Sequence, residues 1–255
     1  MLTQTLWWFG IGLIVCILAR AIKGGFFKKY LVFYVYLSYV LSLTLFKFYL
    51  YVFRFRPGSY RTFYWYTEFL SVAIGYCVIW EVYGHALSAY PGTLRMARRL
   101  VIAIFVMVAA RAFANSLAGP IWGSAETVLD LERNLRTVQA VLLLVIVAVV
   151  TYYMIPIGQN LRGIILGYGF FIGTLVINNT LWSTLGDTYQ KWLQYSQTIT
   201  WLITSLIWSA MLWSYHPNPT PESAIEIERD YERLSARTAQ NLAKVRGYLL
   251  GTVRS

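Results

Sequence analysis

Seven apolar stretches, each long enough to cross a bilayer, occupy most of this 255-residue chain. A helix needs about 20 mostly apolar residues to cross the hydrocarbon core of a membrane. The stretches cover residues 5–22, 30–51, 62–85, 100–119, 138–157, 163–182 and 192–215. The sequence therefore predicts an all-α polytopic membrane protein, a seven-transmembrane-helix bundle with little chain left for a water-soluble domain.

The distribution of basic residues predicts the orientation, because Lys and Arg accumulate in short cytoplasmic loops. The loops after the first, third and fifth stretches and the C-terminal tail hold fourteen Lys and Arg, against six on the opposite side. We expect a multi-pass protein of the bacterial cytoplasmic (inner) membrane with its N-terminus outside and its C-terminus in the cytoplasm. The three arginines of residues 53–61 face the wrong side for this rule. They indicate either a role on the outer face, which we prefer, or a re-entrant helix pair.

The net charge of +11 would indicate nucleic acid as a partner if the chain were soluble. In a membrane protein, this charge sets the topology and attracts anionic lipid headgroups. No patch interleaves basic and aromatic residues. We therefore expect membrane lipids as partners and no nucleic acid.

The composition changes sharply after His216, where a proline-rich linker begins. Beyond the linker, the spacing of Ile227, Tyr231 and Leu234 predicts a helix with one apolar stripe. The chain thus divides into a transmembrane bundle, residues 1–216, and a cytoplasmic linker with an amphipathic helix, residues 217–255. That helix would lie on the membrane surface, pack under the bundle or contact a protein partner. The aromatic faces of the bundle are a second candidate surface for a protein partner.

Charged residues within the predicted spans are candidates for function, because a charge inside a bilayer is costly. There are four of them, Lys47, Glu68, Glu81 and Arg111. Glu68 and Arg111 lie about two turns from the outer ends of consecutive spans, roughly 10 Å below the surface. We expect them to form an ion pair that Lys47 joins.

Two further polar residues extend this predicted cluster. Tyr64 precedes Glu68 by one turn, and Asn115 follows Arg111 by one turn on the same helix face. The cluster either only holds three helices together or lines an outward-facing polar cavity that binds a ligand or relays a proton.

A second polar site is predicted at the cytoplasmic end of the third span. Cys77, Glu81 and His85 recur every four residues and share one helix face. Three ligands from one straight helix cannot surround a metal ion, so we expect no metal here. Pairing of Glu81 with Arg98 or Arg99 at the start of the next helix is simpler. Haem is disfavoured because both histidines lie at helix ends, and we expect no cofactor.

The sixth span contains two glycine pairs at a spacing of four residues, Gly163 with Gly167 and Gly169 with Gly173. Small residues at this spacing let helices approach closely, and we expect both pairs to pack within the bundle. Before the fifth span, residues 120–137 hold several charges and no glycine or proline after 123. We expect this segment to extend the fifth helix outward, and Pro156 to end that helix.

Seven spans with an outside N-terminus resemble the rhodopsin plan. A retinal Schiff base needs a lysine in the middle of the seventh span. Lys191 lies only at its outer edge, so the resemblance implies topology without retinal. The compact form and residues 81–99 also resemble uncharacterised bacterial seven-span membrane protein families, a resemblance that implies no activity and no site residues.

No serine–histidine pair, metal quartet, phosphate-binding glycine loop or carboxylate dyad occurs at a suitable depth, so we expect no enzyme. The leading hypothesis is a receptor-like or sensory module with an outward polar cavity near Glu68 and Arg111 and a cytoplasmic output helix. A structural accessory subunit of a larger membrane complex is a second hypothesis. A small transporter or channel that uses the same two residues is a third.

Overall fold

The computed structural model describes residues 2–52, 57–117 and 125–219, together with residues 229–230, 232–234, 236–238 and 240. These residues form helices joined by short turns and contain no strand, which confirms the predicted all-α class. The short pieces after residue 228 are helical, but most of the predicted amphipathic helix lies outside the described residues.

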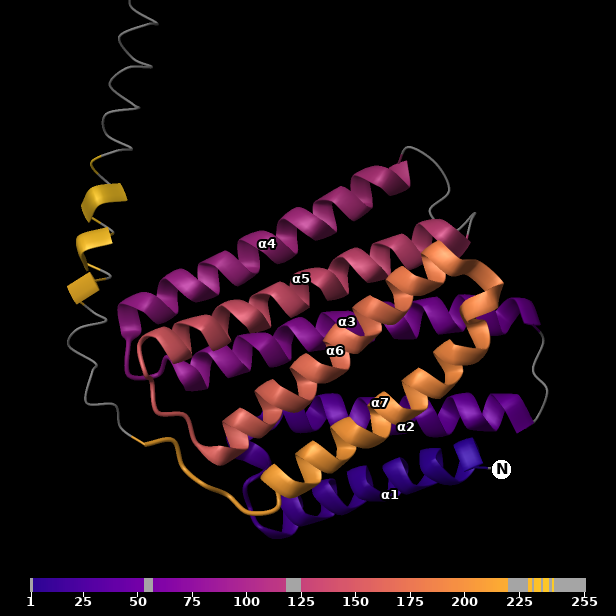
Figure 1. Ribbon diagram of the computed structural model, residues 1–255. Helices are drawn as coiled ribbons and strands as arrows, with labels where there is room; N and C mark the ends of the chain where they lie inside the picture. Colours follow the sequence, from indigo (N-terminus) through magenta and orange to yellow (C-terminus); the bar gives the residue numbers. More distant parts are fainter. Residues whose placement is uncertain are drawn as a thin grey trace, which may run out of the picture.

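Seven long helices follow one another along the chain (Figure 1). They are α1 (Leu2–Lys23), α2 (Leu31–Val52), α3 (Pro57–Ala86), α4 (Pro91–Leu117), α5 (Ala125–Tyr152), α6 (Gln159–Leu185) and α7 (Gln190–Met211), with 3₁₀ turns η1 (Phe27–Tyr30) and η2 (Gly186–Tyr189). Proline begins α3 and α4, a position where its missing N–H costs nothing. Within the described residues, five helices are long and apolar enough to cross a membrane: α1, α2, α3, α5 and α6.

Six of the helices pack as a closed ring. Around this ring, α1 contacts α2, α2 contacts α3, α3 contacts α5, α5 contacts α6, α6 contacts α7, and α7 returns to α1. The remaining helix, α4, packs outside the ring against α3 and α5, and Figure 1 shows it at the edge of the bundle opposite α1. The ring interior is therefore open to side chains of α2, α3, α5, α6 and α7.

Side chains of α3 and α5 are joined by hydrogen bonds to backbone carbonyls. Tyr76 and Tyr83 donate their hydroxyls to the carbonyls of Leu135 and Leu142, at 3.0 and 2.8 Å. Both partners lie 59 residues further along the chain, so α3 and α5 run parallel in one register. The amide of Gln139 donates back to an α3 carbonyl at 2.8 Å. Buried hydroxyl and amide groups need such partners because neither lipid nor core supplies water.

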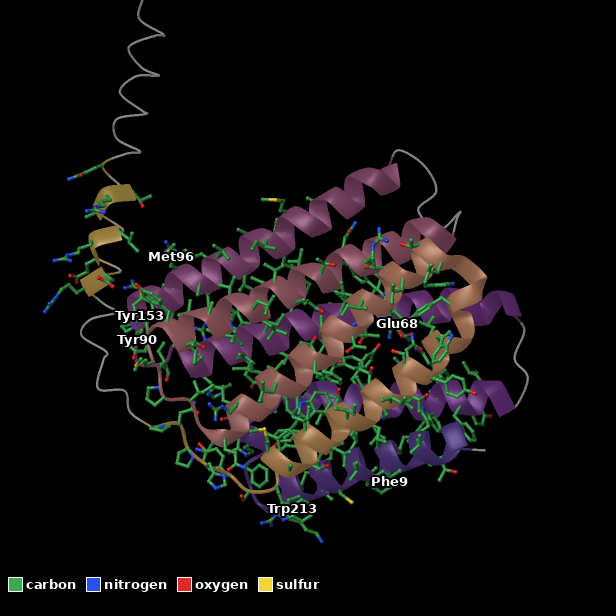
Figure 2. The ribbon with its side chains drawn as sticks, in the orientation of Figure 1. Phe9, Glu68, Tyr90, Met96, Tyr153 and Trp213 are labelled. Carbon is green, nitrogen blue, oxygen red and sulfur yellow. The ribbon has the colours of Figure 1, made fainter. Side chains whose placement is uncertain are left out.

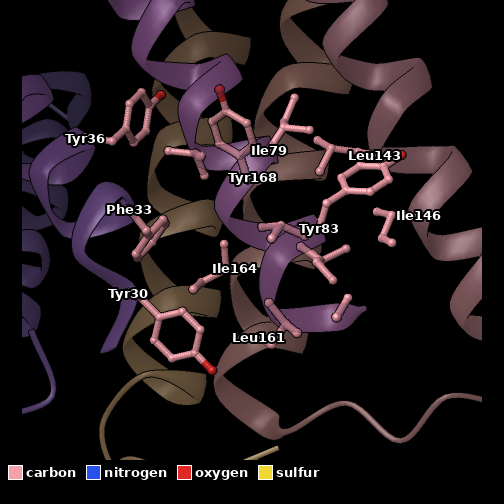
Figure 3. Packing of buried hydrophobic residues seen from close by; sticks show 14 of the residues in the cluster. Tyr30, Phe33, Tyr36, Ile79, Tyr83, Leu143, Ile146, Leu161, Ile164 and Tyr168 are labelled. Carbon is pink, nitrogen blue, oxygen red and sulfur yellow. The ribbon is translucent and has the colours of Figure 1, made fainter. Parts of the chain in front are cut away.

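The aromatic core lies where α2, α3 and α6 meet (Figure 3). Tyr36 of α2 and Tyr168 of α6 pack edge to face, with ring centroids 5.4 Å apart. Phe33 packs against the fully buried Trp208 of α7 in the same way, at 5.3 Å. Aromatic side chains of α2 thus reach across the ring and pack against α6 and α7.

The two glycine pairs of α6 have different surroundings. A side chain at Gly163 or Gly167 would collide with α7, and at Gly167 the obstacle is the indole of Trp208. The predicted close packing is confirmed for this pair. At Gly169 and Gly173, no neighbouring atom of the described residues lies within 4 Å of the place that a Cβ would take, so the prediction is wrong for the second pair.

The ends of α5 differ from the prediction in one respect. Its start at Ala125 confirms that the segment before the fifth span extends this helix outward. Its end at Tyr152 comes before the predicted end at residue 157, because Met154 adopts a left-handed backbone with φ 48°. The N–H groups of Met154 and Ile155 then bond to the carbonyls of Thr151 and Val150, at 3.3 and 2.9 Å. These two bonds are those of a Schellman helix end, which here precedes the proline.

Candidate functional site

Four charged side chains from three helices form one continuous chain of ion pairs. Lys47 of α2 donates to one oxygen of Glu68 of α3 at 2.7 Å. The other Glu68 oxygen accepts from Nη2 of Arg136 of α5 at 2.9 Å. Nε of Arg136 donates to Glu132, one turn earlier on α5, at 2.7 Å. We call these four residues the ion-pair cluster.

The ion-pair cluster is withdrawn from the surface. The side chain of Arg136 is 4% exposed, those of Glu132 and Glu68 are 13% and 16% exposed, and that of Lys47 is 24% exposed. A charge removed from water is tolerated only when an opposite charge and hydrogen bonds compensate it. Glu132 compensates Arg136 within α5, and Glu68 links this pair to Lys47.

The helices that carry the cluster are fixed close to it. The hydroxyl of Tyr39 in α2 donates to the carbonyl of Thr67 in α3 at 2.7 Å, next to Glu68. The α3–α5 hydrogen bonds begin at Leu135, next to Arg136. The backbones around Glu68 and Arg136 are therefore held in place independently of the charges.

A cavity of about 510 Å³ lies inside the ring, and all four residues of the ion-pair cluster line it. Its volume falls in the range of roughly 300–1,000 Å³ that small-molecule sites occupy. Aromatic side chains of α6 and α7 form another part of its wall: Phe171, Trp182 and Trp201. Figure 2 shows Glu68 in the half of the bundle away from Tyr90 and Tyr153, which mark the turns after α3 and α5.

The structure brings together Glu68 and Lys47, as the sequence predicted. The side chains of Arg111, Tyr64 and Asn115 lie outside the described residues, so the predicted pairing with Arg111 is not tested. The two Glu68 oxygens nevertheless already accept from Lys47 and Arg136.

Sequence reasoning missed Arg136 and Glu132. It placed Arg136 on the outward extension of the fifth helix, where an acid and a base four residues apart are typical of an exposed pair. The signal available in the sequence is the absence of glycine and proline after residue 123, which lets the fifth helix begin early. In the structure α5 begins at Ala125, so Arg136 lies three turns inside it.

The second predicted polar site is not assembled as expected. The Glu81 oxygens accept the backbone N–H groups of Val32 and Phe33 at 3.0 and 2.9 Å. Among the described residues, the predicted ion pair of Glu81 with Arg98 or Arg99 does not form. Those N–H groups belong to the first turn of α2 and have no carbonyl partner within the helix. The guanidinium of Arg98 lies instead over the ring of Trp80, 5.1 Å from its centroid.

His85, the third member of that predicted site, packs its ring against Tyr30, with centroids 4.7 Å apart. Cys77 is exposed on the outside of the bundle. Glu81 thus caps α2, and its helix neighbours at 77 and 85 point to other surroundings.

We expect Glu81→Leu to lower the free energy of unfolding by about 2 kcal/mol, because two N–H groups of α2 lose a charged acceptor. Glu81→Gln keeps one acceptor oxygen and should lose about half as much. Denaturant titration in detergent, followed by circular dichroism, measures both. Equal losses for the two variants would show that the negative charge of Glu81, and not its capping of α2, matters.

An asparagine fixes the chain where α7 ends. Asn160 of α6 donates to the carbonyls of Met211 and Ser214, at 3.2 and 2.7 Å. Its side-chain oxygen accepts the backbone N–H of His216. The helix stops at Met211, four residues before the predicted end, and this side chain supplies hydrogen bonds that the helix no longer provides.

A second asparagine holds the segment that follows. Asn218 accepts the N–H of Gly158 at 2.8 Å and donates to the carbonyl of His85 at 3.4 Å. The segment 212–219, which we call the strap, is thereby tied to the start of α6 and the end of α3.

In the part of the chain that the structure describes, no three His, Cys, Asp or Glu residues are grouped so that they could hold a metal ion. No protein-family model, curated protein or solved structure matches this chain.

Proposed function

We propose that this chain is a receptor-like binding protein of the bacterial cytoplasmic membrane that takes up a small ligand in the cavity inside its helix ring. The observation that carries the proposal is Arg136, a 4% exposed cation on the wall of a cavity of about 510 Å³. Charged groups inside a membrane bundle are costly and mark ligand or ion sites by default. Apolar side chains at these positions would stabilise a bundle as well as the buried ion pairs do, so stability alone does not explain the charges.

The proposal includes seven membrane crossings. At about 1.5 Å per residue, the 27 residues of α4 and the 22 residues of α7 both exceed the thickness of about 30 Å of a hydrocarbon core. The polar character of α7 is compatible with crossing, since Thr200, Thr204 and Ser205 are buried within the protein.

The proposed orientation places the cavity on the outside. The cavity lies toward the ends where α2 meets α3 and where α6 meets α7. The basic residues of 20–29 and 95–99 lie at the other ends of their helices, which the distribution of Lys and Arg assigns to the cytoplasm.

In this proposal α7 is the output element. It contributes Gln197, Thr200 and Trp201 to the cavity, and its far end leads into the strap held by Asn160 and Asn218. A ligand that shifts α7 would move the strap and, with it, the chain that continues toward residue 255. A helix that contacts both sites is the kind of rigid element that can couple them.

We expect Thr44→Trp to abolish ligand retention, because the indole would occupy cavity space that the ligand needs, without removing a charge. Ser42→Trp is the matched control. Both hydroxyls donate to the carbonyl four residues earlier on α2, at 2.7 and 2.8 Å, but Thr44 lines the cavity and Ser42 is exposed. Gentle purification from native membranes with mass spectrometry of bound small molecules and lipids measures retention.

A molecule retained by the wild type and Ser42→Trp but lost from Thr44→Trp supports the proposal. Equal retention by all three proteins, or no bound molecule in any, contradicts it. A stoichiometric protein partner in place of a small molecule would favour the accessory-subunit hypothesis.

A further inference from the structure

Among the described residues that line the cavity, the charges sum to zero. Lys47 and Arg136 supply two positive charges, and Glu68 and Glu132 supply two negative ones. A ligand with a net charge would leave one charge without compensation in a site shielded from water. A ligand whose own positive and negative charges sum to zero would leave no charge of the site uncompensated.

Two hydrogen-bonding positions of the ion-pair cluster are left over. The bonds within it use Nε and Nη2 of Arg136 and one oxygen of Glu132. Among the described residues, Arg136 Nη1 donates to no protein atom, and the second Glu132 oxygen accepts from none. A charged donor and a charged acceptor therefore remain side by side, one helical turn apart, on residues that line the cavity.

This pair is complementary to a molecule that carries both charges. A carboxylate or phosphate oxygen matches the guanidinium of Arg136, which binds such groups with a planar set of donors. An ammonium group matches the carboxylate of Glu132. Neither contact requires an existing ion pair of the cluster to open.

The rest of the wall suits an apolar body. Phe171, Leu175, Trp182 and Trp201 come from α6 and α7, which carry none of the four charges. Aromatic and apolar walls with a few polar groups are typical of sites for amphipathic small molecules. The faces of the tryptophans would also favour a nearby ammonium group.

We infer that the ligand of this cavity is a zwitterion, a molecule with one ammonium group and one carboxylate or phosphate group on an apolar body. This inference rests on the proposed function, since it names the ligand class of the same cavity. Two sources share that chemistry: a free amino acid-like molecule and the headgroup of a phosphatidylethanolamine lipid. Experiments on the purified full-length chain can separate them.

The probes are four molecules that share the indole ring and differ in the charged groups attached to it: L-tryptophan (zwitterion), tryptamine (cation), indole-3-acetate (anion) and indole (uncharged). Binding is measured by isothermal titration in nanodiscs of phosphatidylglycerol, which contains no ammonium group. We expect L-tryptophan to bind at least tenfold more tightly than the other three, and Thr44→Trp to abolish this binding. If the natural source is lipid, phosphatidylethanolamine added to the nanodiscs should displace L-tryptophan. The lipid should also remain bound to the protein in native mass spectrometry.

A charge-changing variant tests the proposed contacts directly. Glu132→Gln removes the leftover anionic acceptor and gives the cluster a net charge of +1, so we expect the preference to change from L-tryptophan to indole-3-acetate. Asp230→Asn raises the charge of the whole chain equally, but Asp230 lies beyond the strap and outside the cavity, and it should leave the preference unchanged.

The outcomes distinguish this inference from the proposed function. Equal or tighter binding of tryptamine, indole-3-acetate or indole that is still lost in Thr44→Trp overturns the zwitterion and leaves the cavity as a site. Retention of a molecule with a net charge from native membranes likewise overturns the zwitterion and leaves the cavity as a site. If none of the probes binds and neither does phosphatidylethanolamine, the zwitterion is overturned. If no molecule is retained from native membranes either, the proposed function is contradicted as well as the zwitterion.

Discussion

Replacing Arg136 with methionine is expected to lower the free energy of unfolding by about 3–5 kcal/mol, the usual cost of removing one partner from a buried ion pair. The variant leaves Glu68 and Glu132 facing the cavity, and Lys47 is then the one cation paired with them among the described residues. Methionine fills most of the space of the arginine stem, so the loss reflects charge more than packing. Equilibrium unfolding in mixed detergent micelles, followed by circular dichroism, measures it.

Arg162→Met is the control, because Arg162 is exposed on α6 and belongs neither to the ion-pair cluster nor to the cavity wall. Its removal should change stability by less than about 1 kcal/mol. Adding Glu132→Gln to Arg136→Met should restore part of the loss, because one uncompensated carboxylate disappears. Similar losses for the two arginine variants, or no restoration, would contradict the assignment of Arg136 as the compensating charge.

Replacing Gly167 with leucine is expected to destabilise the bundle by about 2–3 kcal/mol, because a side chain there collides with the indole of Trp208. Trp208 is fully buried and packs against Phe33, so it has no open space into which to move. The α6–α7 contact should loosen first. The measurement is equilibrium unfolding together with the tryptophan fluorescence spectrum of the folded protein.

Gly169→Leu is the matched control, two residues further along the same helix and with open space around it. It should be neutral or slightly stabilising, because leucine favours a helix by about 0.8 kcal/mol over glycine. Destabilisation of both variants to the same degree would mean that the backbone of α6, and not the fit of Trp208, sets the need for glycine.

The helices could be predicted from the sequence because the length of an apolar stretch is a local property. The contact between α3 and α5, which are not consecutive helices, could not. We expected consecutive antiparallel helices to pack together, and α4 does pack on α3, from outside the ring. The pairing of Glu68 with Arg111 stays a prediction, because the side chain of Arg111 lies outside the described residues, and Glu68 is paired with Lys47 of α2 and Arg136 of α5.

The role of Glu81 shows a second limit of sequence reasoning. A carboxylate next to several arginines predicts an ion pair, yet Glu81 binds the backbone N–H groups of Val32 and Phe33. Backbone groups are present at every position, so the sequence does not mark where a helix will offer its first turn to a neighbour. The glycine pairs of α6 show the same limit, since identical spacing occurs on a packed face and on an open one.

The composition of the ion-pair cluster also bears on how the chain enters its membrane during synthesis. Lys47 and Glu68 lie on consecutive helices, so α2 and α3 can insert together as a hairpin in which neither charge meets lipid alone. Arg136 arrives later, and Glu132 accompanies it one turn away on the same helix. On this route each costly charge of the cluster would enter the bilayer with an opposite charge from its own helix or an adjacent one. Assembly of the ring then only has to join two pairs that are already neutral.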